Sequence, residues 1–261
     1  MSRHIKVLLI DALNLIRRVY AAQPGEDGPD RVQSSVSACS LSARRALHQC
    51  SPSHAVCIFE DHGVSWRYHT YANYKAGRKP MPQALQASLD LHKKAFLDIG
   101  LVSLSFENME ADDVIAVMAD KIAAKQGNAV ILSTDKTFMQ LLTDRIIVRD
   151  HFQQSDLDRD YVMKKFGVWP EQFVDFMALC GDSTNNIRGV PGIGPKTAAK
   201  LLKDFETLDR VLASAETIPG KIGKALVEYA NNARESQLLV CLQTGIELGI
   251  NLKSLRYTNK G

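Results

Sequence analysis

Acidic side chains are the residues of this sequence best suited to chemistry. The densest group is Glu110-Ala-Asp112-Asp113, which opens a segment with helical spacing. For an isolated group the simpler interpretation is a helix cap, because the helix dipole favours acids in a first turn. Three other acids follow short apolar runs, namely Asp11, Glu60 and Asp135. If the fold brings these carboxylates together, their mutual repulsion requires a cation to hold them.

The apolar runs before these acids have the length and β-branched content of buried strands. We expect strands over 7–10, 55–59, 129–132 and 146–148, and helices over 13–22, 32–48 and 114–125. Strands that alternate with helices predict an α/β domain with a parallel sheet. Because parallel strands all end at the same edge, Asp11, Glu60 and Asp135 are expected to meet there.

Carboxylates without clustered His or Cys favour magnesium or manganese over zinc. The five cysteines form no CxxC pair, so we expect neither a thiolate zinc site nor disulfides, and a reduced cytoplasmic setting. No apolar run is long enough for a membrane span. Magnesium held by carboxylates is the usual means of hydrolysing phosphodiesters, since it supplies a hydroxide and neutralises charge on the phosphate.

Positive charge is concentrated in two windows. The chain has 261 residues, 23% of them charged, and a formal net charge of only +3. Residues 62–89 and 183–203 contain no Asp or Glu, and each window carries four Lys or Arg residues. The near-neutral total therefore conceals two basic segments on an otherwise acidic chain.

Both windows have features of nucleic-acid contacts. The first interleaves aromatic residues with cations, a composition that suits base stacking and phosphate neutralisation, although a solvated basic loop is the alternative. The second contains Gly189-Val-Pro-Gly-Ile-Gly-Pro-Lys196-Thr197. Pro195 interrupts the Walker A pattern, so we expect no nucleotide cofactor. A glycine hairpin that leads into a helix N-terminus can instead bind a phosphate, with an ordinary helix–helix turn as the alternative.

The chain is expected to divide into two domains and a tail. The α/β domain covers 1–159, with an arch near residues 66–90. Strand signals stop near residue 160, and residues 160–251 read as a small all-helical domain. Its expected helices cover 170–179, 196–205, 208–213 and 221–242. Residues 252–261 are expected to form a tail.

At this point the sequence resembles the 5′-nucleases of the flap endonuclease family. The resemblance rests on segments that follow in the family's order: Asp11-Ala-Leu-Asn, Phe59-Glu-Asp, Tyr74-Lys-Ala-Gly-Arg78, Glu110-Ala-Asp-Asp, Ser133-Thr-Asp-Lys and Gly181-Asp-Ser-Thr-Asn-Asn. It implies a PIN-like nuclease domain and a helix-three-turn-helix (SAM-fold) DNA-binding domain. It also implies cleavage of branched DNA with a free 5′ end.

The resemblance assigns roles to individual residues. Seven acids look like the family's magnesium ligands: Asp11, Glu60, Glu110, Asp112, Asp113, Asp135 and Asp182. Lys75 and Arg78 resemble basic arch residues that stabilise charge on the scissile phosphate, and Tyr74 is a candidate stacking platform. Backbone carbonyls that would bind potassium belong to Leu179, Cys180, Arg188, Val190 and Ile193. The DNA phosphate would contact Gly192, Ile193, Gly194, Pro195, Lys196 and Thr197.

Three positions depart from the family pattern. Members with a full second metal site have Asp where this chain has Thr137 and Asn185, and Glu60 stands where Asp is usual. The loss of two negative charges predicts a weak second cation. We therefore expect one firmly held magnesium, with Asp112 as the first candidate for its direct ligand. A second ion would bind mainly through water and the DNA phosphate.

The leading hypothesis is a magnesium-dependent, structure-specific flap endonuclease with possible 5′-3′ exonuclease activity. The expected partner is branched or 5′-flap DNA, bound by a monomer that has no membrane contact. The main alternative is a DNA-structure-binding protein with a weakened catalytic site, which Thr137 and Asn185 favour. A PIN-domain ribonuclease of toxin type is the third hypothesis, and the second domain argues against it.

Overall fold

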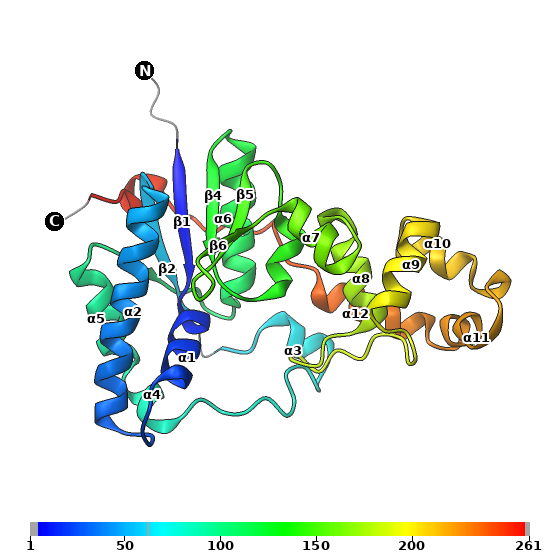
Figure 1. Ribbon diagram of the computed structural model, residues 1–261, viewed down its shortest axis with the longest axis horizontal. Helices are drawn as coiled ribbons and strands as arrows, with labels where there is room; N and C mark the ends of the chain where they lie inside the picture. The colour runs from blue at the N-terminus through cyan, green and yellow to red at the C-terminus, as the bar shows by residue number, and fades with distance from the viewer. Residues whose placement is uncertain (1–4, 62, 259–261) are drawn as a thin grey trace.

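A twisted six-stranded sheet forms the centre of the first half of the protein (Figure 1). The computed structural model describes residues 5–61 and 63–258. The strand order is β3-β2-β1-β4-β5-β6, and only the β5–β6 pair is antiparallel. The strands are β1 Lys6–Asp11, β2 His54–Ile58, β3 Val102–Leu104, β4 Asn128–Leu132, β5 Ile146–Asp150 and β6 Ser155–Leu157.

Helices cover both faces of this sheet, which is why its central strands are apolar on both sides. Leu8 and Ile10 of β1 pack toward α1 (Ala12–Ala22), α2 (Pro29–Cys50) and α5 (Leu89–Asp98). Val7 and Leu9 point the other way, toward α6 (Ala111–Ala124). The expected α/β architecture is thus confirmed. The carboxyl ends of β1, β2 and β4 open on one edge.

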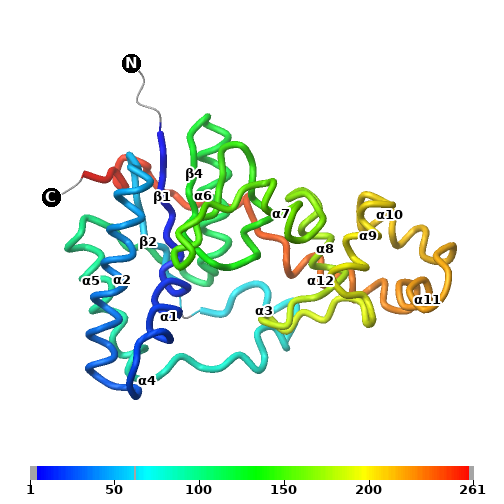
Figure 2. Tube along the Cα trace, in the orientation of Figure 1, coloured from blue at the N-terminus to red at the C-terminus, as the bar shows by residue number. Residues whose placement is uncertain are grey.

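The arch, residues 66–90, connects this edge to the second half of the protein. It begins with α3 (Trp66–Thr70), continues without regular structure to α4 (Gln83–Ala87), and ends in the first residues of α5. In Figure 2 the cyan chain runs from the sheet to α3 beside α12 and returns below α1. The backbone carbonyl of Lys79 accepts a hydrogen bond from Arg17 at 3.0 Å, which fixes the returning limb to α1.

Helices make up the second half, as expected. They are α7 Arg159–Phe166, α8 Phe173–Cys180, α9 Pro195–Phe205, α10 Leu208–Ala213, α11 Gly220–Glu228 and α12 Ala230–Val240. Short 3₁₀ turns lie at η1 Lys136–Leu141, η2 Pro170–Gln172, η3 Ala215–Thr217 and η4 Leu252–Leu255. The single expected segment 221–242 is two helices, because the backbone of Tyr229 leaves the helical region between them.

Residues 252–258, expected as part of a tail, instead pack on the first domain. Leu255 is buried, and the backbone amide of Tyr257 donates to the carbonyl of Ser53 at 3.0 Å. The chain therefore returns beside β2 after it has formed the helical domain (Figure 1). Residues 259–261 of the expected tail lie outside the described part of the chain.

Short strands escaped the sequence analysis. β3 and β6 have three residues each, which is too short for a periodic pattern. All five cysteines are free thiols. Among the helices of the described residues, none combines the length and the apolar character that a membrane crossing requires.

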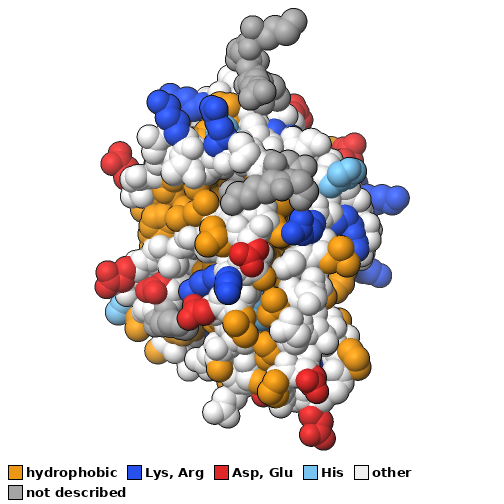
Figure 3. All heavy atoms as spheres, turned by 90° about the vertical axis from the view of Figure 1, so that its left-hand side faces the viewer, with side chains coloured by type: hydrophobic (Ala, Val, Ile, Leu, Met, Phe, Trp, Pro, Cys, Tyr) orange, Lys and Arg blue, Asp and Glu red, His pale blue; other side chains and the backbone are white. Residues whose placement is uncertain are grey.

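The end of the molecule formed by α2 and α5 has a mixed surface. Three leucines are more than half exposed there, Leu41 on α2 and Leu91 and Leu97 on α5. Figure 3 shows this end, where apolar side chains alternate with charged groups of both signs. The two basic windows lie elsewhere, in the arch and after α8.

Candidate active site and DNA interface

A cavity of about 390 Å³ lies at the carboxyl edge of the sheet. Six of the seven predicted acids line it: Asp11, Glu60, Glu110, Asp112, Asp135 and Asp182. Five cations line it as well: Arg17, Arg18, Lys75, Arg78 and Lys136. Segments that are far apart in the sequence thus deliver charges of both signs to one place, which we call the acidic cavity.

Ser133 ties together the acids that follow β1 and β4. Asp11 caps α1, and its other carboxylate oxygen accepts from the Ser133 hydroxyl at 2.8 Å. The backbone amide of Asp135 donates to the same hydroxyl at 3.1 Å, and the Asp135 carboxylate caps η1 through Thr137. These short local bonds fix both carboxylates at adjacent strand ends.

Burial and mutual repulsion make two of the cavity acids, Asp11 and Asp112, hard to ionise. Burial raises the pKa of Asp112 well above its ordinary value, and the charges of Asp135 and Asp11 raise it further. The pKa of Asp11 is raised mainly by burial as well, with added repulsion from Asp135 and Glu60. A bound cation would relieve this repulsion and favour the ionised carboxylates.

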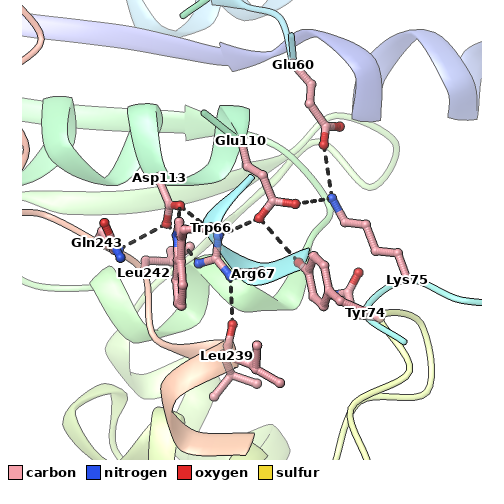
Figure 4. A network of polar contacts seen from close by, with 12 residues as sticks. Glu60, Trp66, Arg67, Tyr74, Lys75, Glu110, Asp113, Leu239, Leu242 and Gln243 are labelled. Carbon is pink, nitrogen blue, oxygen red and sulfur yellow. Dashed lines mark hydrogen bonds and ion pairs between the residues drawn. The ribbon is translucent and has the colours of Figure 1, made fainter. Parts of the chain in front are cut away.

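The ammonium group of Lys75 enters the acidic cavity from the arch. Its Nζ lies 2.5 Å from Oε1 of Glu110 and 3.1 Å from Oε1 of Glu60 (Figure 4). Burial alone would lower the pKa of Lys75, but Glu60 and Glu110 raise it above its ordinary value. The lysine is therefore a fixed positive charge among the acids.

Asp113 does not line the cavity. Its carboxylate pairs with the guanidinium of Arg67 at 2.7 and 2.9 Å, and also accepts from Trp66 Nε1 and the Gln243 amide, both at 3.0 Å (Figure 4). Consecutive residues of a helix point about 100° apart, so Asp112 faces the cavity while Asp113 faces inward. The structure therefore places Asp113 apart from the six predicted ligands that line the cavity.

Tyr74 is also placed differently from the expectation. Its side chain is 5% exposed, and its hydroxyl lies 3.4 Å from Oε2 of Glu110. The exposed neighbour Tyr68 packs edge-on against it, with ring centroids 5.3 Å apart. A buried ring offers no free face to a base, and the stacking role of Tyr74 stays a prediction.

Asp182 is already paired with two other side chains. Lys136 Nζ lies 3.0 Å from its Oδ1, and Asn185 donates to its Oδ2 at 2.7 Å. Thr137, the other departure from the family pattern, is buried beside it. Among residues 5–61 and 63–258, no three Asp, Glu, His or Cys side chains are arranged to hold a metal by themselves.

The loop between α8 and α9, residues 181–194, forms the predicted hairpin. Gly181 and Gly189 have φ of 76° and 65°, and a Cβ added to Gly189 would lie 2.4 Å from the Gly181 nitrogen. Only glycine allows this approach, which brings the backbones of Cys180 and Arg188 together. The Leu179 carbonyl accepts the Val190 amide at 2.8 Å. The residues predicted to bind potassium thus lie at the end of α8 and in this loop.

The end of the hairpin loop is open to a ligand. A Cβ at Gly192 or Gly194 would meet no atom within 4 Å. Gly194 caps α9, whose first turn contains no acid, and Lys196 is exposed. Ile193 is buried, so only its backbone could contact a phosphate.

Two family models together match nearly the whole chain. The 5′-3′ exonuclease N-terminal resolvase-like domain matches residues 6–167, and the 5′-3′ exonuclease C-terminal SAM fold matches residues 168–260. The chain belongs to the 5′-3′ exonuclease family. As a member of this family, it is a nuclease that hydrolyses phosphodiester bonds.

Relatives in the 5′-3′ exonuclease family match over nearly their full length. Flap endonuclease Xni of Photobacterium profundum is 44% identical over 255 residues, with 97% of each chain covered. Flap endonuclease Xni of Vibrio cholerae is 40% identical over 261 residues, with 99% of this chain and 98% of the relative covered.

Solved structures confirm the fold. The T5 5′-exonuclease with bound zinc ions superposes with a TM-score of 0.76 at 21% identity, and covers 90% of this chain and 89% of its own. The catalytic core of Rad2 in complex with DNA substrate gives a TM-score of 0.54 at 18% identity, over 88% of this chain and 74% of its own.

Sequence reasoning missed several residues in and around this 5′-3′ exonuclease cavity. Arg17 and Arg18 lie outside the acid-free windows, although both fall within the helix that follows Asp11. Arg67 was counted only as one cation of the first window, yet it is 2% exposed. Its role could not be found from the sequence, because its partners come from distant segments.

Proposed function

We propose that this nuclease is a magnesium-dependent, structure-specific enzyme that cleaves 5′ flaps of branched DNA, with 5′-3′ exonuclease capacity. The observation that carries the proposal is the position of Lys75, which brings a charge from the arch into the acidic cavity. A phosphodiester that enters the cavity would meet carboxylates that can hold a metal. It would also meet the Lys75 ammonium, which can neutralise the negative charge of the phosphate. The names of the Xni relatives and the DNA-bound Rad2 core support a DNA substrate.

Three aspartates fit magnesium best. Asp11, Asp112 and Asp135 offer hard oxygen donors whose repulsion a divalent cation would relieve. When bound, magnesium would supply a hydroxide at neutral pH and neutralise charge on the phosphate. Because magnesium gives up its water reluctantly, an ion held by these carboxylates would keep several waters. We propose Asp112 as the first direct ligand and leave Asp113 out of the set.

Partners of the remaining acids favour one firmly held ion. Glu60 and Glu110 share the ammonium of Lys75, and Asp182 is bonded to Lys136 and Asn185. These acids therefore have few oxygens free to bind a second cation. We propose that a second ion, when present, is held mainly by water and the DNA phosphate.

Lys75 and Arg78 would act on the substrate rather than on the metal. Both line the cavity on the side of the arch, and Lys75 is held charged by its two glutamates. Preorganised cations of this kind stabilise the charge that develops on the phosphate during cleavage. We propose that these two residues supply that stabilisation.

The hairpin loop would bind the DNA duplex at a distance from the cleavage site. The exposed backbone of residues 192–197 and the N-terminus of α9 suit a phosphate. Potassium fits the loop because its carbonyls are neutral oxygen donors brought together by Gly181 and Gly189. The cavity and the loop belong to one chain, which supports action as a monomer.

The test is a magnesium titration of 5′-flap cleavage by the purified protein, with matched flap RNA as a second substrate. We expect cleavage of the DNA flap that rises with magnesium and is abolished by a chelator. Flap binding without cleavage at any magnesium or manganese concentration would instead establish a DNA-structure-binding protein. Faster cleavage of the RNA flap would favour the ribonuclease alternative.

A further inference from the structure

Arg67 uses every hydrogen-bond donor that an arginine has. Its Nη1 donates to Glu110 at 2.5 Å and to Asp113 at 2.7 Å, and its Nη2 donates to Asp113 at 2.9 Å. The remaining two bonds go to backbone carbonyls, from Nη2 to Cys241 at 3.0 Å and from Nε to Leu239 at 2.8 Å. A guanidinium has five N–H groups, so all are satisfied.

These bonds join two helices that belong to different halves of the protein. Glu110 and Asp113 belong to the cap and first turn of α6, whereas Leu239 lies in the last turn of α12 (Figure 4). Cys241 is the C-terminal cap of α12. The carbonyls at a helix C-terminus lack partners within the helix and carry partial negative charge. A buried cation between acids and such carbonyls is therefore attracted from both sides.

We infer that Arg67 is a positioning residue, which locks the first turn of α6 to the end of α12 and thereby aims Asp112 into the acidic cavity. The inference rests on the proposed metal site. Asp112 lies between the two acids that Arg67 holds, so their pairing sets the rotation of the turn that carries it. Asp112 itself is left to face the cavity.

The same contact reaches the arch. The Glu110 carboxylate accepts a hydrogen bond from Arg67 at Oε2 and one from Lys75 at Oε1. Arg67 therefore also fixes the acid that orients Lys75. Figure 4 shows this series of contacts from Asp113 through Arg67 and Glu110 to Lys75. One buried guanidinium thus orders both the candidate metal ligand and the cation expected at the phosphate.

Direct contact between Arg67 and DNA is disfavoured by its surroundings. The residue is 2% exposed, and its guanidinium lies against the Trp66 ring, 4.5 Å from the centroid. No N–H group remains for a phosphate. Lysine would keep the charge but could not make the paired contact with Asp113, because an ammonium lacks the planar fork.

Three variants test this role, namely Arg67→Lys, Asp113→Asn and, as the matched control, Arg149→Lys. Arg149 pairs with Asp156 at 2.5 Å between β5 and β6, and it does not line the cavity. For each folded protein, calorimetry measures magnesium binding without DNA. Fluorescence anisotropy measures flap binding without metal, and steady-state cleavage gives kcat and KM.

We expect both Arg67→Lys and Asp113→Asn to weaken magnesium binding and lower kcat by about 10-fold or more, as changes beside metal ligands commonly do. Flap affinity without metal should stay within about two-fold of the parent, because no phosphate contact is removed. The double variant should be little worse than either single one, since both break the same contact. Arg149→Lys should match the parent protein.

Unchanged magnesium affinity and kcat in Arg67→Lys or Asp113→Asn would overturn the inference. Weaker flap binding with normal magnesium affinity would also overturn it, in favour of a phosphate contact. If Arg67→Lys does not fold, Asp113→Asn carries the test, because the amide keeps the shape of the carboxylate while it removes the charge and replaces one acceptor oxygen with an NH2 group. A parent protein that neither binds magnesium nor cleaves flaps would refute the proposed function itself. Failure of the proposed function is thus distinguished from failure of the Arg67 inference.

Discussion

The ammonium of Lys75 lies 2.5 Å from the carboxylate of Glu110, although the two residues are 35 positions apart in the chain. The arch thus places a cation inside the acidic cavity before any substrate arrives. The backbone amide of Lys75 also donates to the carbonyl of Asn185 at 2.9 Å, which connects the arch to the hairpin loop. Catalytic edge, arch and helical domain meet at this one residue.

Removing the Lys75 ammonium should slow cleavage. We expect Lys75→Met to lower kcat by about 100-fold or more, because a preorganised charge at the phosphate is lost. Lys79→Met is the matched control, since Lys79 belongs to the same arch but does not line the cavity. Steady-state flap cleavage measures both. Equal losses in the two variants would show that only the overall charge of the arch matters.

Neutralising Asp112 should separate cleavage from binding. We expect Asp112→Asn to abolish cleavage of a 5′ flap, since the proposed metal would lose its first ligand. Flap affinity should remain largely intact, because the hairpin loop is untouched. Cleavage assays and anisotropy without metal test the two statements. Unchanged cleavage would refute the metal assignment, and lost binding would show that Asp112 has a wider structural role.

The Asn186 side chain connects the hairpin loop to the arch. Asn186 donates to the carbonyl of Asn73 at 2.7 Å. We expect Asn186→Ala to speed trypsin cleavage in the arch by several-fold, up to about 10-fold, because one hydrogen bond no longer opposes local opening. Asn231→Ala on α12 is the control. Equal digestion rates for the variant and the parent would contradict this contact.

Basic segments predict a steep salt dependence of DNA binding despite the net charge of +3. Lys196 and Lys200 are exposed on α9. We expect each change to Gln to reduce the slope of log Kd against log salt by about 1. Lys94→Gln, on the mixed surface of α5, should leave the slope unchanged. A flat dependence for the parent between about 50 and 200 mM salt would contradict the proposed interface.

His151 should make stability depend on pH. Its side chain is buried, neither ring nitrogen has a hydrogen-bond partner among the described residues, and burial lowers its pKa from 6.5 to about 4. Below pH 6.5 the His151 imidazole becomes protonated in the unfolded chain but stays neutral in the folded protein. The free energy of unfolding therefore falls as the pH drops toward 4. The loss attributable to this residue is at most about 3 kcal/mol.

We expect His151→Leu to remove this part of the pH dependence. Urea unfolding at pH 7 and pH 5 measures the free energy of unfolding for the parent and the variant. His48→Leu, at an exposed position of α2, is the control and should retain the dependence of the parent. A variant that loses as much stability as the parent between these pH values would contradict the role of His151.

The meeting of Asp11, Glu60 and Asp135 could be predicted from the sequence, because each follows a buried strand and parallel strands end together. The place of Asp113 could not. In sequence it is equivalent to Asp112, and only the rotation of α6 against Arg67 separates them. Tyr74 shows the same difference, since its aromatic type suggested stacking but packing beneath Tyr68 buried it.

The sequence by itself determined the α/β and helical halves, the acid-bearing strand ends and the glycine hairpin. These depend on local periodicity and on backbone angles that few residues allow. The tertiary structure alone decided which charges neutralise one another. Arg67 and Lys75 form ion pairs with acids from distant segments of the chain. The packing around each acid then determines whether it faces such a partner or the open cavity. No spacing along the chain encodes that choice.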